Sequence, residues 1–239
     1  MRQVLLTFDI DWAPDFAIKP IVEFLIKKEI PSIWFVTHNS IVLDQMRDRP
    51  DLFELGIHPN FFPNSTQGSN ENDIFENLIK IVPEARCMRT HGLYQSSNLI
   101  LNASKKYNIK YDFSQFLPFN NIHLNRFFYK DMSIERMPYN WEDDISIYHP
   151  LGLKQSCNLI LEMNQIVLDF HPIHCFLNTT KIEKFEKVKN RISENMNSME
   201  ALKNSKETTF GVFNAFDFFI SIANTEIEIK KLNNFLISK

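Results

Sequence analysis

LLTFDIDW, residues 5–12, is the stretch around which the rest of this chain is organised. It begins as a short buried strand and runs directly into two carboxylates two positions apart, Asp9 and Asp11. Side chains alternate between the two faces of a strand, so both acids project from one strand end into one small volume. Two carboxylates placed in this way repel each other unless a cation or a shared proton neutralises them. The stretch therefore indicates either two solvated acids or a cation site.

The composition is typical of a globular protein with a substantial core, because 44% of the 239 residues are hydrophobic and 23% are charged. With only 5 glycines and no GxGxxG or GxxxxGK[ST] motif, a glycine-rich phosphate loop is excluded. A net charge of -3 without a basic block gives no electrostatic footprint for nucleic acid. Cys87, Cys157 and Cys175 are odd in number and widely spaced, so they predict neither a disulfide framework nor a cysteine-ligated zinc. We find no signal peptide and no apolar run long enough to span a bilayer, and therefore expect a cytoplasmic protein.

Strand-like and helix-like segments alternate along the chain. Strands are predicted at residues 4–8, 32–37, 53–57, 85–88, 111–113 and 165–170, and helices at residues 18–28, 41–47, 73–81 and 98–107. This alternation predicts βα units and a mainly parallel sheet, closed or open. The tail differs, with a charged helix expected at 181–203, a loop at 204–209 and an apolar, packed helix at 213–222. We expect one domain over residues 1–239, with a helical tail from about residue 181.

Polar side chains gather where the predicted strands end. They are Asp9, Asp11, His58, Arg89, His91, residues 141–144, His171 and His174. In parallel βα folds ligands bind at the carboxyl ends of the strands, so these side chains are expected at one edge of the sheet. Carboxylate and imidazole together suit a divalent transition metal, and zinc is the commonest catalytic choice. Each residue also has an ordinary structural explanation: Tyr139 and Trp141 could be core aromatics, and Asp143 and Asp144 could cap a helix.

The ordered motifs TFDID (7–11), GIHPN (56–60), RTHG (89–92), YNWEDD (139–144) and LDFHP (168–172) extend this pattern over most of the chain. Together they resemble the polysaccharide deacetylases of the NodB-homology class, carbohydrate esterase family 4, in a divergent FDxD variant. The resemblance covers roughly residues 5–178. It implies an α/β fold, a distorted (β/α) barrel of the seven-stranded, TIM-like type. It also implies the removal of N- or O-acetyl groups from sugars with one divalent metal, most often zinc.

The resemblance also implies roles for individual residues. Asp9 resembles the general base, and Arg89 matches the arginine that orients it. Asp11 and His58 resemble metal ligands, and His171 matches the general acid.

The fourth motif, residues 141–144, resembles a segment that supplies a pocket wall and an acid that tunes His171. That acid is Asp143 or Asp144. The expected substrate contacts are Trp12, Asn60, Tyr139 and Trp141.

One departure from the family pattern concerns the metal. The second motif usually reads H-x-x-x-H, but Phe62 stands four residues after His58. The third ligand is therefore expected from His91, with His174 as the alternative and Asn60 as a weaker candidate.

The expected function is a metal-dependent hydrolase that removes an acetyl or other acyl group from a sugar or glycan precursor made inside the cell, in surface polysaccharide biosynthesis. Other interpretations stay open. The first motif also resembles the DxD opening of Mg²⁺-dependent haloacid-dehalogenase phosphatases, although these need no histidines at later strand ends. A DxD can mark a metal–nucleotide site in glycosyltransferases, although there it rarely ends the first strand. Phe62 leaves open a degenerate deacetylase fold that binds glycan or a partner protein without turnover.

Overall fold

The computed structural model describes residues 1–183, 185–187, 189 and 208–237. Its strands are β1 (Arg2–Asp9), β2 (Ser32–Val36), β3 (Phe53–Ile57), β4 (Cys87–Met88), β5 (Tyr111–Asp112), β6 (Asn125–Tyr129), β7 (Met132–Arg136), β8 (Trp141–Glu142), β9 (Gln165–Phe170) and β10 (Ile227–Ile229). Its helices are α1 (Asp15–Lys28), α2 (Val42–Arg47), α3 (Glu71–Ile81), α4 (Ser97–Tyr107), α5 (Asp143–Ser146), α6 (Leu153–Ile160), α7 (Pro172–Leu177), α10 (Val212–Ser221) and α11 (Leu232–Ile237), with a 3-10 turn η1 (His91–Leu93).

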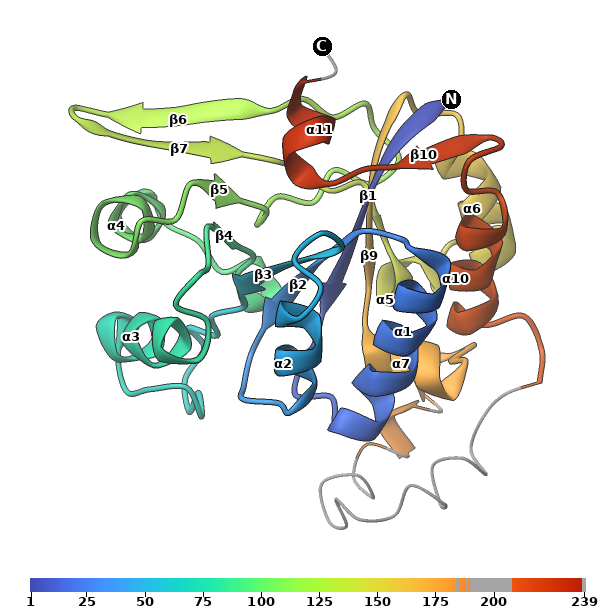
Figure 1. Cartoon of the computed structure of the whole chain (residues 1–239), viewed down its shortest axis with the longest axis horizontal. Coiled ribbons are helices and arrows are strands. Elements are labelled where there is room, and N and C mark those ends of the chain that lie inside the picture. Colours follow the sequence, from blue (N-terminus) through green and yellow to red (C-terminus); the bar gives the residue numbers. More distant parts are fainter. Residues whose placement is uncertain (184, 188, 190–207, 238–239) are drawn as a thin grey trace.

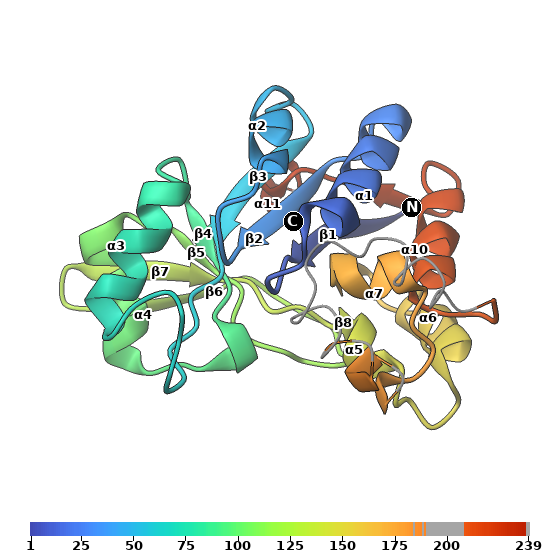
Figure 2. The same ribbon diagram turned by 90° about the horizontal axis from the view of Figure 1, so that it is seen from below.

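All the strands belong to one curved sheet (Figure 1). Their order is β6-β7-β5-β4-β3-β2-β1-β9-β8, and β10 pairs with the first residues of β1. Every pair is parallel except the β6–β7 hairpin. The helices lie around the outside of the curve, as Figure 2 shows for α1, α2, α3 and α4. This arrangement follows from the βα alternation, because parallel neighbours need a crossover between them.

The segment from β7 to β8 draws the two ends of the sheet together. β7 pairs with β5, whereas β8 pairs with β9 at the far end of the path. Between them the amide of Tyr139 donates to the carbonyl of Gln115 at 2.9 Å, and the amide of Asn140 donates to Val167 at 3.2 Å. When β7 and β8 are counted as one segment, this path contains seven parallel strands in the described part of the chain. The predicted distorted (β/α) barrel is therefore confirmed.

β1 pairs with β2, β9 and β10, and its two faces pack into two different apolar clusters. Leu5 points into the barrel, where it joins an apolar cluster with Phe35 and Val167. Leu6 and Phe8 point outward and pack beneath the helices. Alternation along the strand thus sends Thr7 and Asp9 toward the same interior as Leu5. The acid that ends β1 is therefore buried, with a relative exposure of 4%.

Most predicted elements are confirmed, and β3 and β9 have the predicted bounds. The strands β6, β7 and β8, the helices α5, α6 and α7 and the terminal elements β10 and α11 were not predicted, because they are short and carry no long periodic run. The predicted packed helix at 213–222 is confirmed as α10. Most of the predicted helix at 181–203 and of the loop at 204–209 lies outside the described residues. The single domain over residues 1–239 stays a prediction. Among the helices described, none has the length and apolar character needed to cross a membrane.

Candidate metal centre and active site

The predicted site residues meet at the carboxyl end of the parallel strands. Asp9 is the last residue of β1, His58 follows β3 and His171 follows β9. Arg89 follows β4 and leads into the η1 turn, which begins at His91. Because neighbouring parallel strands end at the same edge, residues far apart in the sequence are brought to one place.

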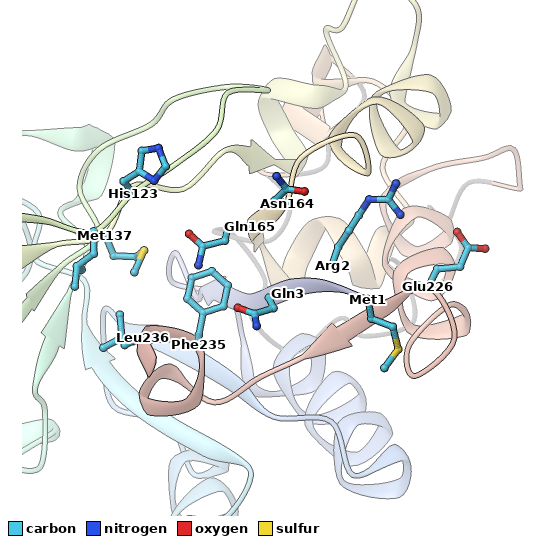
Figure 3. Close-up of a pocket in the computed structure, with 11 residues that line it drawn as sticks. Met1, Arg2, Gln3, His123, Met137, Asn164, Gln165, Glu226, Phe235 and Leu236 are labelled. Carbon is cyan, nitrogen blue, oxygen red and sulfur yellow. The ribbon is translucent and has the colours of Figure 1, made fainter. Parts of the chain in front are cut away.

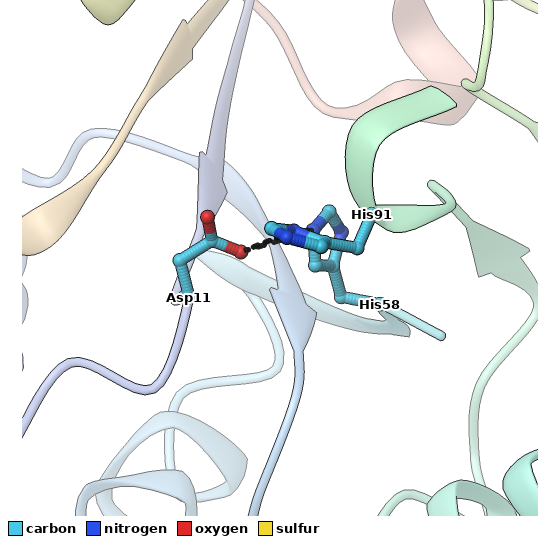
Figure 4. Close-up of side chains that lie close together, drawn as sticks. All are labelled: Asp11, His58 and His91. Carbon is cyan, nitrogen blue, oxygen red and sulfur yellow. Dashed lines mark hydrogen bonds and ion pairs between the residues drawn. The ribbon is translucent and has the colours of Figure 1, made fainter. Parts of the chain in front are cut away.

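Asp11, His58 and His91 point at one another (Figure 4). Oδ1 of Asp11 lies 3.1 Å from Nε2 of His58 and 3.1 Å from Nδ1 of His91. The side chain of Asp11 is 22% exposed and that of His91 is 30% exposed, whereas that of His58 is only 3% exposed. One carboxylate and two imidazoles that face a solvent-accessible volume fit the three protein ligands of a catalytic zinc with an open position.

The backbone turns sharply to place the Asp11 carboxylate. Asp11 and Trp12 have φ values of 38° and 56°, in the left-handed region that residues with a Cβ seldom adopt. Such strain persists only where the surroundings hold it, and it clusters at functional sites. Burial alone would raise the pKa of Asp11, but hydrogen bonds from His58 and His91 hold this pKa well below its usual value. The carboxylate is therefore ionised and suited to a cation.

The other two candidates for third ligand lie apart from this group. His174 is buried on α7, where its Nδ1 lies 3.2 Å from Oγ1 of Thr179. Burial and the charge of His171 lower the pKa of His174 to about 3. The Oδ1 atom of Asn60 accepts a hydrogen bond from the amide of Phe62 at 3.0 Å, which closes a local turn.

Asp9 is held by Arg89 in the barrel interior. Nη1 of Arg89 donates to Oδ1 of Asp9 at 2.8 Å, and Nη2 donates to Oγ1 of Thr7 at 2.9 Å. The guanidinium lies 4.6 Å from the ring centroid of Phe35 and 4.3 Å from that of Tyr139. An arginine packed between two rings is rigid, so it fixes the orientation of the Asp9 carboxylate.

Asp169 is a site residue that the sequence analysis missed. It lies within β9, is fully buried, accepts a hydrogen bond from Oγ1 of Thr7 at 2.9 Å and pairs with Nη1 of Arg89. Burial raises the pKa of Asp169 to about 8 despite the opposing charge of Arg89. One carboxylate inside the otherwise apolar run IVLDF (166–170) was the available signal, because a buried acid needs a partner.

His171 is held by Asp143. Nδ1 of His171 lies 2.7 Å from Oδ1 of Asp143, and the amide of His171 donates to Oδ2 at 2.8 Å. Nε2 of the same ring faces Oδ2 of Asp11 at 3.6 Å. Burial opposes the charged form of His171, but Asp143, Asp144 and Asp11 together raise its pKa well above the ordinary value. Asp143 is thus the residue that contacts the ring, and Asp144 acts on it through charge.

Two cavities border the candidate metal centre. One of about 480 Å³ is lined in part by Trp12, His171 and Ile173. The other, of about 280 Å³, is lined in part by Asp9, Tyr139 and His171. Both also include Asp11, His91 and Asp144, so the cluster lies between them.

Trp12 and Tyr139 therefore lie where a substrate could contact them, whereas Trp141 and Asn60 line neither cavity. Trp141 is fully buried, donates from Nε1 to Oγ of Ser156 at 3.1 Å and packs on Phe170 at 5.0 Å. It is a core aromatic, the alternative that the sequence also allowed.

A larger cavity of about 740 Å³ lies at the opposite end of the barrel (Figure 3). It is lined by the first residues of β1 and β9, including Arg2, Gln3 and Gln165. None of the predicted site residues lines it, so size alone does not identify the active site.

A curved parallel sheet with carboxylates, histidines and an arginine at its carboxyl end is the architecture expected of a polysaccharide deacetylase. Residues 6–189 match the model of the family described as WbmS-like polysaccharide deacetylases, and the chain belongs to this family. This membership favours the deacetylase interpretation of LLTFDIDW over the phosphatase one.

Several solved structures are similar to this chain, among them the following two. A protein from Bordetella bronchiseptica, whose proposed role is polysaccharide deacetylation in O-antigen biosynthesis, is 27% identical, with a TM-score of 0.80 over 91% of this chain and 89% of that one. The 4-alpha-glucanotransferase of Thermococcus litoralis is 9% identical, with a TM-score of 0.55 over 100% of this chain and 38% of that one, and it shares the fold alone. No curated protein matches the sequence.

Proposed function

We propose that this protein is a metal-dependent carbohydrate deacetylase. It removes an N-acetyl or other acyl group from a sugar or glycan precursor of a surface polysaccharide, and it acts on that precursor inside the cell. The convergence of Asp11, His58 and His91 carries this proposal. His91 would be the third metal ligand in place of the family's second histidine, at whose position this chain has Phe62. The proposed O-antigen role of the Bordetella relative supports the choice of substrate.

Asp11, His58 and His91 would hold the metal, and zinc suits this mixture of oxygen and nitrogen donors. When bound, such an ion supplies a Lewis acid that polarises the acyl carbonyl and makes water more acidic.

Two ion pairs, Asp9 with Arg89 and His171 with Asp143, carry out the two proton transfers. Asp9 accepts the proton of the attacking water through its carboxylate, which Arg89 orients. His171 donates a proton from Nε2 to the leaving nitrogen, because its Nδ1 is engaged by Asp143. The acid and the base therefore act from the ends of β9 and β1, two strands that pair in parallel.

Acetate release from N-acetylated sugars by the zinc-loaded protein tests the proposal. We expect turnover in the wild type, and a loss of about 10²- to 10⁴-fold in Asp9→Asn, the range typical of a general base. Absence of acetate release from any N-acyl sugar, together with absence of bound metal by emission spectroscopy, would contradict the proposal. Release of phosphate from p-nitrophenyl phosphate with Mg²⁺ would support the phosphatase alternative instead.

A further inference from the structure

Three aromatic rings form a shelf beside the candidate metal centre. This aromatic shelf consists of Phe61, Phe62 and Tyr94, whose ring centroids lie 5.8 Å apart for Phe62 and Tyr94 and 5.9 Å apart for Phe61 and Tyr94. Phe62 is 43% exposed and Tyr94 is 42% exposed. The ring of Phe62 also meets His91 edge-on, at 6.3 Å between centroids. The shelf is thus continuous with a candidate metal ligand, and exposed aromatic surface of this kind marks binding sites.

A groove of about 590 Å³ lies against the shelf. Its other wall is the loop that leads into α3, where Asn64, Ser65 and Ser69 offer amide and hydroxyl groups. Glu71 is the one charged residue among the described residues that line it, and no lysine or arginine of that set does. A ligand with several phosphates would therefore find no countercharge here.

The loop of the groove is anchored before any ligand arrives. Nε2 of the buried Gln67 donates to the carbonyls of Thr37 and His58, both at 3.0 Å, and its Oε1 accepts from the amide of Asn60 at 2.6 Å. The loop is thereby tied to the backbone of a candidate metal ligand. A wall held in this way is pre-organised, which lowers the entropic cost of binding.

The shelf also depends on one glycine. Gly92 has a φ of +58°, and a Cβ at this position would lie 2.5 Å from Cε2 of Phe62. A side chain at residue 92 would therefore displace Phe62 from its place beside His91. The glycine of the RTHG motif allows the turn and the close approach of the ring.

We propose that this groove is a saccharide subsite for the sugar unit next to the one that is deacetylated. A pyranose ring presents apolar C–H groups on its faces and hydroxyls around its rim, which match an aromatic shelf opposite amide and hydroxyl side chains. The substrate is then an uncharged oligosaccharide or glycan chain rather than a free monosaccharide or a nucleotide sugar. This inference rests on the proposed function and names its substrate class.

Calorimetric titration of the zinc-loaded protein with an uncharged N-acetylglucosamine trisaccharide, with the monosaccharide and with its nucleotide-diphosphate form tests the subsite. We expect the trisaccharide to bind about tenfold more tightly than the other two. Tyr94→Ala removes a ring that packs on Phe61 and Phe62 but keeps the hydrogen bond from the amide of residue 94 to the carbonyl of His91. It should weaken trisaccharide binding about fivefold and leave monosaccharide binding unchanged. Tyr129→Ala, which removes an aromatic ring that is 54% exposed on the β6–β7 hairpin, is the matched control and should change neither.

Phe62→Ala provides a second variant, with the same loss of trisaccharide binding expected. Equal affinities for the three ligands, or a Tyr94→Ala variant that binds the trisaccharide like the wild type, would overturn the subsite even if acetate is released. Tight, Tyr94-dependent binding of the trisaccharide without acetate release would support the subsite and contradict the proposed deacetylation. The two proposals can thus fail separately.

Discussion

Nε2 of His58 lies 3.3 Å from Nδ1 of His91, although the two residues are 33 positions apart in the sequence. Each of these nitrogens is also 3.1 Å from the same oxygen of Asp11. Two imidazole nitrogens and a carboxylate oxygen that share one small volume form a set of donors that a divalent cation stabilises. This relationship makes the candidate metal centre testable residue by residue.

We expect His91→Ala to weaken zinc binding by about 100-fold or more, because loss of a direct ligand should cost at least as much as loss of a residue that orients one. Competition with a chromophoric chelator measures the affinity. The controls are His174→Ala and His123→Ala, which remove a buried and an exposed histidine outside the cluster. A large loss in His174→Ala with none in His91→Ala would assign the third ligand to α7 instead.

Asp143→Asn should change the pH dependence of deacetylation. The charge of Asp143 raises the pKa of His171 against the effect of burial, so its removal lowers that pKa. A general acid must be protonated, so the decline of activity on the alkaline side would begin at a lower pH than in the wild type. The alkaline limb of the rate profile should move down by about 1 to 2 pH units. Asp144→Asn, which removes a charge without direct contact to the ring, should move the limb less. An identical profile for Asp143→Asn and the wild type would remove His171 from the role of acid.

Asp169→Asn should change how stability depends on pH. The pKa of Asp169 is raised to about 8 in the folded protein, chiefly by burial, against about 4 when unfolded. Between these values the unfolded chain releases a proton that the folded chain keeps, so this group lowers stability as the pH rises through the window. The variant lacks the effect, and its free energy of unfolding relative to the wild type should therefore rise from pH 4 to pH 8.

Denaturant unfolding at several pH values measures this difference, and a constant difference would show that Asp169 is ionised throughout.

Arg89→Met removes the common partner of two buried carboxylates, those of Asp9 and Asp169. It should destabilise the protein by about 3 to 5 kcal/mol.

His174 should make the protein sensitive to acid. Burial, together with the charge of His171, lowers the pKa of His174 to about 3, below the ordinary value of about 6.5. As the pH falls through this window the unfolded chain gains a proton that the folded chain does not, and stability falls by up to about 1.4 kcal/mol per pH unit. His174→Gln should reduce the slope of unfolding free energy between pH 6.5 and pH 4. An unchanged slope would mean that His174 already carries a proton in the folded protein.

The order of the elements, and the end of the sheet where the candidate site lies, could be predicted from the amino-acid sequence. Apolar runs bounded by polar residues predicted β3 and β9 with the bounds that the structure has. Parallel strands share a carboxyl edge, so the positions of Asp9, His58 and His171 after successive strands were enough to expect them together. Both inferences depend on local patterns that repeat along the chain.

The choice between candidate residues that sequence patterns leave equivalent depended on the folded chain. His91, His174 and Asn60 all follow strand ends, but the η1 turn directs His91 toward His58, whereas α7 directs His174 toward Thr179. In the same way, α5 begins at Asp143, and this residue rather than Asp144 contacts His171. The direction of a side chain after a strand depends on the turn that follows and on the elements packed around it. Neither can be inferred from the periodicity of the strand, which is why the choice of His91 as the proposed third ligand required the folded chain.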